Sequence, residues 1–195
     1  MRRLRQALAL STLSLVSAAT MLASPAAAAT VDSAGCPTPT RAEAKRSAAG
    51  KSDQPPKGAT ALRGVRVNHI PKGFSSGQVV VNKHDGISEY GYQWTDDRSE
   101  VDRKQRSLWV RVVCWPDAHK LSQLKNAPFD LGTFSGDVRT AKIGGREVLT
   151  QEGDGALGHG QYAGWVERKG TVITVMASQP LVPHLGKIIK GIRLP

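Results

Sequence analysis

We predict an α+β fold built on a single antiparallel sheet of about seven or eight strands, with two helices on one face. Short runs of alternating apolar and polar residues, separated by turn signals, predict the strands. Two amphipathic stretches, one near the middle of the chain and one at its end, predict the helices. Because strands precede a helix twice, we expect two similar halves, related either by duplication or by architecture alone.

The N-terminus has the composition of a signal peptide, which we assign to residues 1–29. A basic "MRRLRQ" precedes the uncharged "ALALSTLSLVSAATMLA", and "SPAAAAT" offers small residues for cleavage near Ala28 or Ala29. A membrane-spanning helix is disfavoured, because this stretch of about 17 residues is diluted by Ser and Thr. We therefore expect a secreted protein, extracellular or associated with the cell wall, with no transmembrane segment after signal removal.

Removal of residues 1–29 leaves 24 Lys and Arg against 16 Asp and Glu, a net charge of +8 over 166 residues. That length fits one domain with a tail. An exported basic protein meets anionic surface polymers first, so we expect an anionic cell-wall polymer or an envelope protein as partner and no nucleic acid. Self-repulsion that keeps the protein soluble explains the charge equally well.

Only two cysteines are present, Cys36 and Cys114, and in an oxidising compartment we expect them to form a disulfide. Lipid attachment at Cys36 is the alternative. It requires an apolar residue where Ser33 stands, so we reject it.

Residues 30–60 contain few large apolar side chains and predict a disordered polar arm and linker. Within this arm, Thr40 and Glu43 have the spacing of a capping box and Gly50 is a stop signal, which together predict one short helix. The α+β domain is expected to span residues 61–195.

The first half of this domain predicts four strands and a helix, in the segments "LRGVRVNHI", "GQVVVNKHDG", "ISEYGYQWT", "RSLWVRVVCW" and "PDAHKLSQLKNAP". In the last of these, Asp117 is the expected cap, and Leu121 and Leu124 are expected to point inward. Both faces of "RSLWVRVVCW" are apolar, which indicates a central strand covered on both sides.

The second half repeats this order. "DVRTAKIGGREVLT" predicts two strands joined by a Gly-Gly turn, and "GQYAGWVERKGTVITVMA" predicts a hairpin that turns at Lys169-Gly170. "QPLVPHLGKIIKGIRLP" predicts the terminal helix, with apolar residues at helical spacing and basic residues late.

The segment Gly164-Trp165-Val166-Glu167-Arg168-Lys169-Gly170, continued by "TVITV" and a helix rich in Leu and Ile, resembles the C-terminal part of exported domains in envelope proteins of Gram-positive bacteria, actinobacteria among them. The resemblance covers about a quarter of the chain and includes no catalytic motif. It implies an exported α+β protein and transfers no site residue.

An aromatic cluster followed by a basic turn is the main candidate for ligand binding. Rings stack on sugar faces and cations bind phosphate or carboxylate, so this combination would suit a sugar-containing anionic polymer. Burial of the rings as core beneath the helices is the alternative, and the register of the strands decides between the two. The candidate residues are Tyr90, Tyr92, Trp94, Trp109, Trp115, Arg98, Arg103, Lys104 and Arg106.

Catalytic and metal-binding signatures are weak, so the main prediction is a non-catalytic binding or interaction module at the cell envelope. The chain has no H-E-x-x-H, C-x-x-C or G-x-S-x-G motif, and we predict no metal and no cofactor. The alternative is a secreted hydrolase with a site in turns, formed by His84, Asp85, Asp154 and His159. A proteinase inhibitor has little support, since a single disulfide would have to hold its loop.

Overall fold

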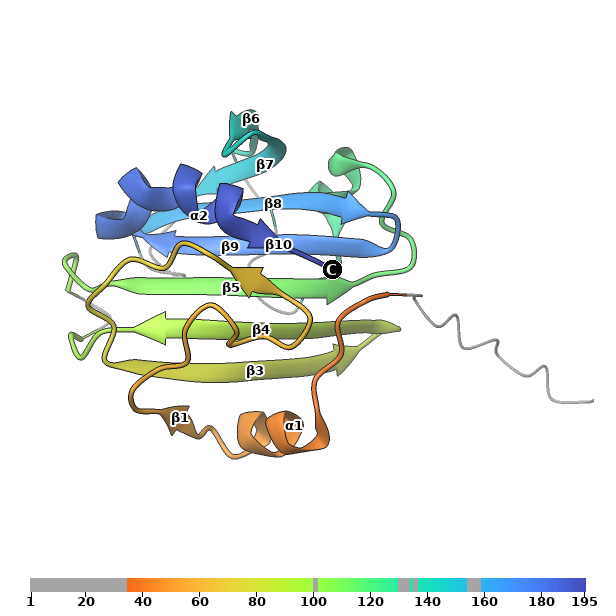
Figure 1. Cartoon of the computed structure of the whole chain (residues 1–195). Helices are drawn as coiled ribbons and strands as arrows, with labels where there is room; N and C mark the ends of the chain where they lie inside the picture. The colour runs from red at the N-terminus through yellow and green to blue at the C-terminus, as the bar shows by residue number, and fades with distance from the viewer. Residues whose placement is uncertain (1–34, 100–101, 130–133, 135–136, 154–158) are drawn as a thin grey trace, which may run out of the picture. The chain divides into compact units, whose positions relative to one another are not determined.

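An eight-stranded antiparallel sheet forms the centre of the computed structural model, which describes residues 35–99, 102–129, 134, 137–153 and 159–195 (Figure 1). The strands follow one another across the sheet as β1 (Ser52–Asp53), β3 (Ser76–His84), β4 (Ile87–Thr95), β5 (Ser107–Cys114), β9 (Thr171–Ser178), β8 (Gly160–Arg168), β7 (Arg146–Glu152) and β6 (Arg139–Ile143). This arrangement confirms the predicted fold class. The predicted signal peptide lies outside the described residues.

Two meanders, β3-β4-β5 and β7-β8-β9, meet where β5 pairs with β9, so the sheet has two similar halves. Trp94 and Trp165, which occupy matching places in the two halves, belong to the same apolar cluster. The first predicted strand departs from this scheme. Only β2 (Arg66–Val67) forms there, and it pairs with β10 (Ile192–Arg193) in a separate two-stranded sheet.

Every residue of β5 is buried, as its two apolar faces predict for a central strand. Val110 and Val112 pack with α2 (Leu185–Gly191) on the face that we call the α2 face. Val113 packs on the opposite face with η1 (Leu121–Asn126), a 3₁₀ helix, and we call this the η1 face.

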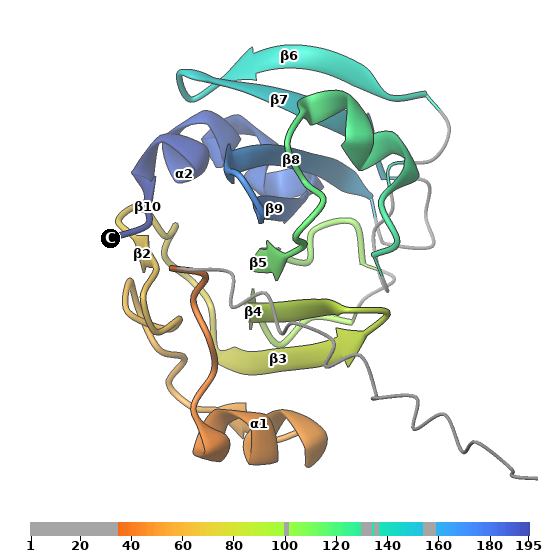
Figure 2. The same ribbon diagram turned by 90° about the vertical axis from the view of Figure 1, so that its right-hand side faces the viewer.

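The prediction that both helices share one face of the sheet is therefore wrong. Leu124 of η1 and Ile188 of α2 belong to the two different apolar clusters, and Figure 2 shows the two segments on opposite sides of the sheet. The physical reason is that β5 and β9 are apolar on both faces, so each face requires its own cover. The terminal helix also begins as a 3₁₀ turn, η2 (Gln179–His184), where Pro183 lies inside the helical segment.

The segment predicted as a disordered arm contains two elements of the structure, a helix and a short strand. The capping box of Thr40 and Glu43 forms as expected and starts α1 (Arg41–Ala48). The following β1 pairs with β3, and the Ser47 Oγ of α1 accepts a hydrogen bond of 2.8 Å from the Val81 N–H of the same strand. Hydrogen bonds to β3 thus hold α1 and β1 against the sheet, although this segment contains few large apolar side chains.

Cys36 and Cys114 form the predicted disulfide, which attaches the chain just before α1 to the end of β5. The bond is consistent with folding in an oxidising compartment. Among the described helices, none has the length and apolar character needed to span a membrane.

Candidate functional site

Three of the predicted ligand-binding rings, Tyr90, Tyr92 and Trp94, form a row on β4 that points to the α2 face. All three are almost completely buried. Residues 40–65, which we call the covering segment, lie over this row and include α1 and β1. The rings therefore belong to the core of the protein rather than to an exposed platform.

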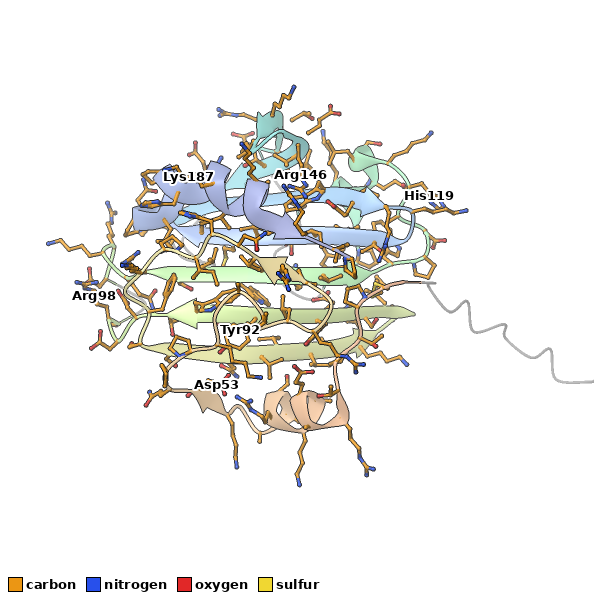
Figure 3. All side chains as sticks on the ribbon, in the orientation of Figure 1. Asp53, Tyr92, Arg98, His119, Arg146 and Lys187 are labelled. Atoms are coloured by element: carbon orange, nitrogen blue, oxygen red, sulfur yellow. A yellow bond between two sulfur atoms is a disulfide. The ribbon has the colours of Figure 1, made fainter. Side chains whose placement is uncertain are left out.

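The covering segment binds this row through paired hydrogen bonds. The Tyr90 hydroxyl donates to Glu43 Oε1 at 3.0 Å and accepts from the Arg63 N–H at 2.8 Å. The Tyr92 hydroxyl donates to Asp53 Oδ2 at 2.9 Å and accepts from the Lys57 N–H at 3.0 Å. Figure 3 shows Tyr92 in the sheet and Asp53 below it.

These contacts shift the pKa values of both partners at the Tyr90 hydroxyl. Burial, reinforced by the Glu43 carboxylate, raises the pKa of Tyr90 to about 12. Burial also raises the pKa of Glu43, but hydrogen bonds from Thr40 and Tyr90 outweigh it, so that pKa lies below its usual value. The bond thus joins a neutral phenol to an ionised carboxylate at neutral pH.

The remaining two predicted rings lie elsewhere, so the five rings do not form one surface. Trp109 lies opposite Gln93 in the β4–β5 register, one residue out of phase with the aromatic row, and therefore points to the η1 face. It is 8% exposed, and its indole N–H has no hydrogen-bond partner among the residues that the structure describes. Trp115 is half-buried after β5 and contacts Phe129 edge-on, with the ring centroids 6.0 Å apart.

The four predicted cations lie in the segment between β4 and β5, after the strand that carries the aromatic row. Arg98 is exposed at the end of the sheet and pairs with Asp96 at 2.7 Å (Figure 3). Arg103 and Lys104 are also exposed. Only Arg106 approaches an aromatic ring, since its guanidinium lies 5.5 Å from the ring centroid of Phe74.

An open groove of about 320 Å³ lies beside this contact. The covering segment contributes Lys57 to its lining, and the segment between β2 and β3 contributes Lys72 and Phe74. Trp94 lies beneath it, nearly fully buried, and its indole N–H donates to the Lys57 carbonyl at 2.6 Å. The complete lining is Pro56, Lys57, Gly58, Ala59, Val67, Asn68, Ile70, Pro71, Lys72, Gly73, Phe74 and Trp94.

Of the predicted site residues, only Trp94 lines the groove, and Arg106 reaches it through Phe74. Sequence reasoning missed Lys57, Lys72 and Phe74. Lys72 precedes Gly73 in a stretch that has the composition of a turn, and Lys57 lies in the stretch interpreted as linker. No spacing in the sequence indicates that these two segments meet.

A buried ionic cluster occupies the η1 face of the sheet and was not predicted either. The Arg111 guanidinium donates to Glu89 at 2.6 Å, to the Tyr162 hydroxyl at 2.7 Å and to Thr174 at 3.1 Å. Both charged residues are at most 3% exposed. Burial raises the pKa of the Tyr162 hydroxyl, although the adjacent Arg111 cation opposes that shift. These hydrogen bonds and the Glu89 carboxylate compensate the cost of burying the Arg111 charge in the sheet.

Of the turn residues proposed for a hydrolase site, the structure brings two together and separates a third from them. His84 Nδ1 lies 3.5 Å from Asp85 Oδ2. This pair is at the end of the sheet where β5 ends with Cys114, whereas His159 precedes β8 beside Gln179, at the other end of the strands. Asp154 lies outside the described residues. Within the described part of the chain, no group of three or more His, Cys, Asp or Glu side chains could hold a metal ion.

No family model, no curated protein and no solved structure matches the chain.

Proposed function

We propose that this protein is an exported, non-catalytic binding module of the cell envelope that holds an anionic wall polymer in the groove beside Phe74. The observation that carries the proposal is that Lys57 and Lys72, from separate segments, line the same groove as the half-buried ring of Phe74. The Arg106 guanidinium over that ring adds a third cation. An aromatic surface flanked by cations suits a polymer of sugars joined by phosphate or bearing carboxylate.

The composition of the groove favours binding over catalysis. Its lining contains no carboxylate, imidazole, thiol or hydroxyl side chain, so Lys57 and Lys72 are the lining side chains that could act as an acid, a base or a nucleophile. The net charge of the chain without residues 1–29 adds a long-range attraction toward anions. The disulfide agrees with an extracytoplasmic location.

Rigidity of the groove wall is a further argument for a built binding site. The backbone of Lys57 is held twice, since its N–H donates to Tyr92 and its carbonyl accepts from Trp94. Binding to a preorganised wall costs less conformational entropy than binding to a free loop. Tyr92 and Trp94 of the aromatic row thus hold the Lys57 wall of the groove from below.

Co-sedimentation with isolated Gram-positive cell walls over a salt series tests the proposal. We expect wild-type protein to be retained at low salt and released as the salt concentration rises, because salt screens exposed charges. Lys72→Glu and Phe74→Ala should each reduce retention several-fold. Lys125→Glu makes the same charge change on the exposed surface of η1 and serves as the matched control.

Two outcomes would contradict the proposal. One is the absence of retention even at low salt. The other is an equal loss in Lys72→Glu and Lys125→Glu, which would indicate attraction by net charge without a site. Walls digested with protease before the assay separate a polymer from an envelope protein, because only a protein partner is removed by digestion.

A further inference from the structure

The two edges of the main sheet are protected differently. At one edge, β3 is covered by β1, which pairs with Gly77 and Gln78, and by α1, whose Ser47 binds the Val81 N–H. At the other edge, β6 pairs only with β7 within the described part of the chain. Figure 2 shows β6 at the top of the sheet with no labelled element beyond it.

The register of the β6–β7 hairpin identifies which backbone groups of β6 point away from the sheet. Gly144 and Gly145 form a two-residue turn with positive φ values of 60° and 85°, so Ile143 and Arg146 are the hydrogen-bonded pair that closes it. Since such pairs alternate along antiparallel strands, Ala141 is also bonded to β7. The N–H and C=O groups of Thr140 and Lys142 therefore face outward.

The side chains around this edge are mostly basic. Arg139 and Lys142 of β6 are exposed, and so are Lys187 and Lys190 of α2, which packs beside β6. Two exposed acids also lie there: Glu147, opposite Lys142 on β7, and Asp137, two residues before Arg139. Half-buried Ala141 and Ile143 continue the apolar α2 face up to the edge, where an added strand could extend it.

We propose that the β6 edge is a docking site for an extended acidic segment of a partner protein, which adds to the sheet as a ninth strand. Its backbone would pair with the outward groups of Thr140 and Lys142, and its carboxylates would lie near Arg139, Lys187 and Lys190. A second copy of this chain is a poor occupant, because pairing β6 with itself would bring like charges together. This site is separate from the groove.

Amide hydrogen exchange of the ¹⁵N-labelled protein, followed by NMR, tests this pairing with a defined probe. The probe is the blocked peptide acetyl-Glu-Val-Glu-Val-Glu-amide, and the control peptide carries Lys in place of Glu. We expect the acidic peptide to slow exchange at Thr140 and Lys142 by about tenfold or more at saturation. Ala141 and Ile143, already bonded to β7, should change little. Attraction by charge alone would not produce this alternation.

Two variants separate charge from backbone pairing. Compared with wild type, the double variant Arg139→Glu/Lys142→Glu should bind the acidic peptide about tenfold more weakly and the Lys peptide about tenfold more tightly. Lys142→Pro removes an outward N–H without removing a bond to β7, and it should abolish protection of Thr140. If Lys142→Pro fails to fold, the charge-reversal variant still decides the question.

The proposal is overturned if neither peptide protects Thr140 and Lys142, if both peptides protect them equally, or if protection appears only at other strands. The groove variant Lys72→Glu should bind the acidic peptide like wild type. Failure of the edge proposal is thereby distinguishable from failure of the groove proposal.

Discussion

Replacement of Arg111 by methionine measures how much the buried ionic cluster contributes to the stability of the sheet. Arg111 and Glu89 are 1% and 3% exposed, and their nearest atoms lie 2.6 Å apart. The variant therefore takes the guanidinium away from a buried carboxylate and leaves it the His84 ring, whose Nε2 lies 3.3 Å from Glu89 Oε1. Breaking such a pair by removing one partner costs about 3–5 kcal/mol. That is a large fraction of the roughly 5–15 kcal/mol by which domains of this kind are stable.

Urea denaturation followed by far-ultraviolet circular dichroism provides the measurement. With a slope of about 2 kcal/mol per molar urea, the midpoint of Arg111→Met should fall by about 1.5–2.5 M. The double variant Arg111→Met/Glu89→Met should recover at least about 2 kcal/mol, because two apolar side chains leave no buried charge unpaired. Exposed Arg103→Met is the control and should change stability by no more than about 0.5 kcal/mol.

A loss below about 1 kcal/mol in Arg111→Met would refute this reasoning, since it would mean that the His84 contact or water compensates Glu89 without the guanidinium. So would a double variant as unstable as the single one. That result would show that Arg111 acts through its packing against Trp109 and Phe129, whose ring centroids lie 4.9 and 5.5 Å from its guanidinium carbon.

Three further predictions concern the attachments between segments. The double variant Cys36→Ser/Cys114→Ser should lose roughly 4 kcal/mol in a urea titration, as the chain-entropy model gives for a separation of 78 residues; a loss under about 1 kcal/mol would contradict it. Arg146 donates to the carbonyls of Ile189 and Ile192 at 2.6 and 2.9 Å. Arg146→Met should therefore lower the free energy of unfolding by about 1–3 kcal/mol and speed amide exchange in α2. Unchanged exchange in α2 would show that Arg146 does not hold the end of this helix. Because the pKa of Glu43 is lowered in the folded protein, its carboxylate stabilises the fold above pH 4.5, and this contribution disappears as the pH falls below that value. Glu43→Gln should therefore show a smaller acid-induced drop in the urea midpoint than wild type. An equal drop in the two proteins would refute this prediction.

The strands and hairpins of the sheet were predictable because their signals are local. Alternation marks β4, a run that is apolar on both faces marks β5, and the pairs Gly144-Gly145 and Lys169-Gly170 mark two of the turns. The position of the helices was not predictable in the same way. The two apolar faces of β5 were visible in the sequence, but they do not specify which helix covers which face.

The covering segment and the groove were harder to foresee, because they depend on contacts between distant residues. The capping box of Thr40 and Glu43 indicated a helix, yet no periodicity shows that Glu43 would bind Tyr90, 47 positions later. The aromatic row was identified from the sequence, and the structure resolves its two interpretations in favour of the core. Lys57 and Lys72 carry no local signal at all.

The pairing of β5 with β9 has a consequence for the order in which the protein can fold. Arg111 and Thr174, which lie across this seam, are 63 positions apart in the chain. A chain that lacks its last quarter would therefore have an open edge at β5, a strand whose residues are all buried in the complete sheet. The entropy cost of bringing β5 and β9 together falls before their contacts can form, and proteins that depend on such distant contacts fold slowly. During synthesis, the β5 edge of the first meander stays uncovered until β9 of the second meander has been made.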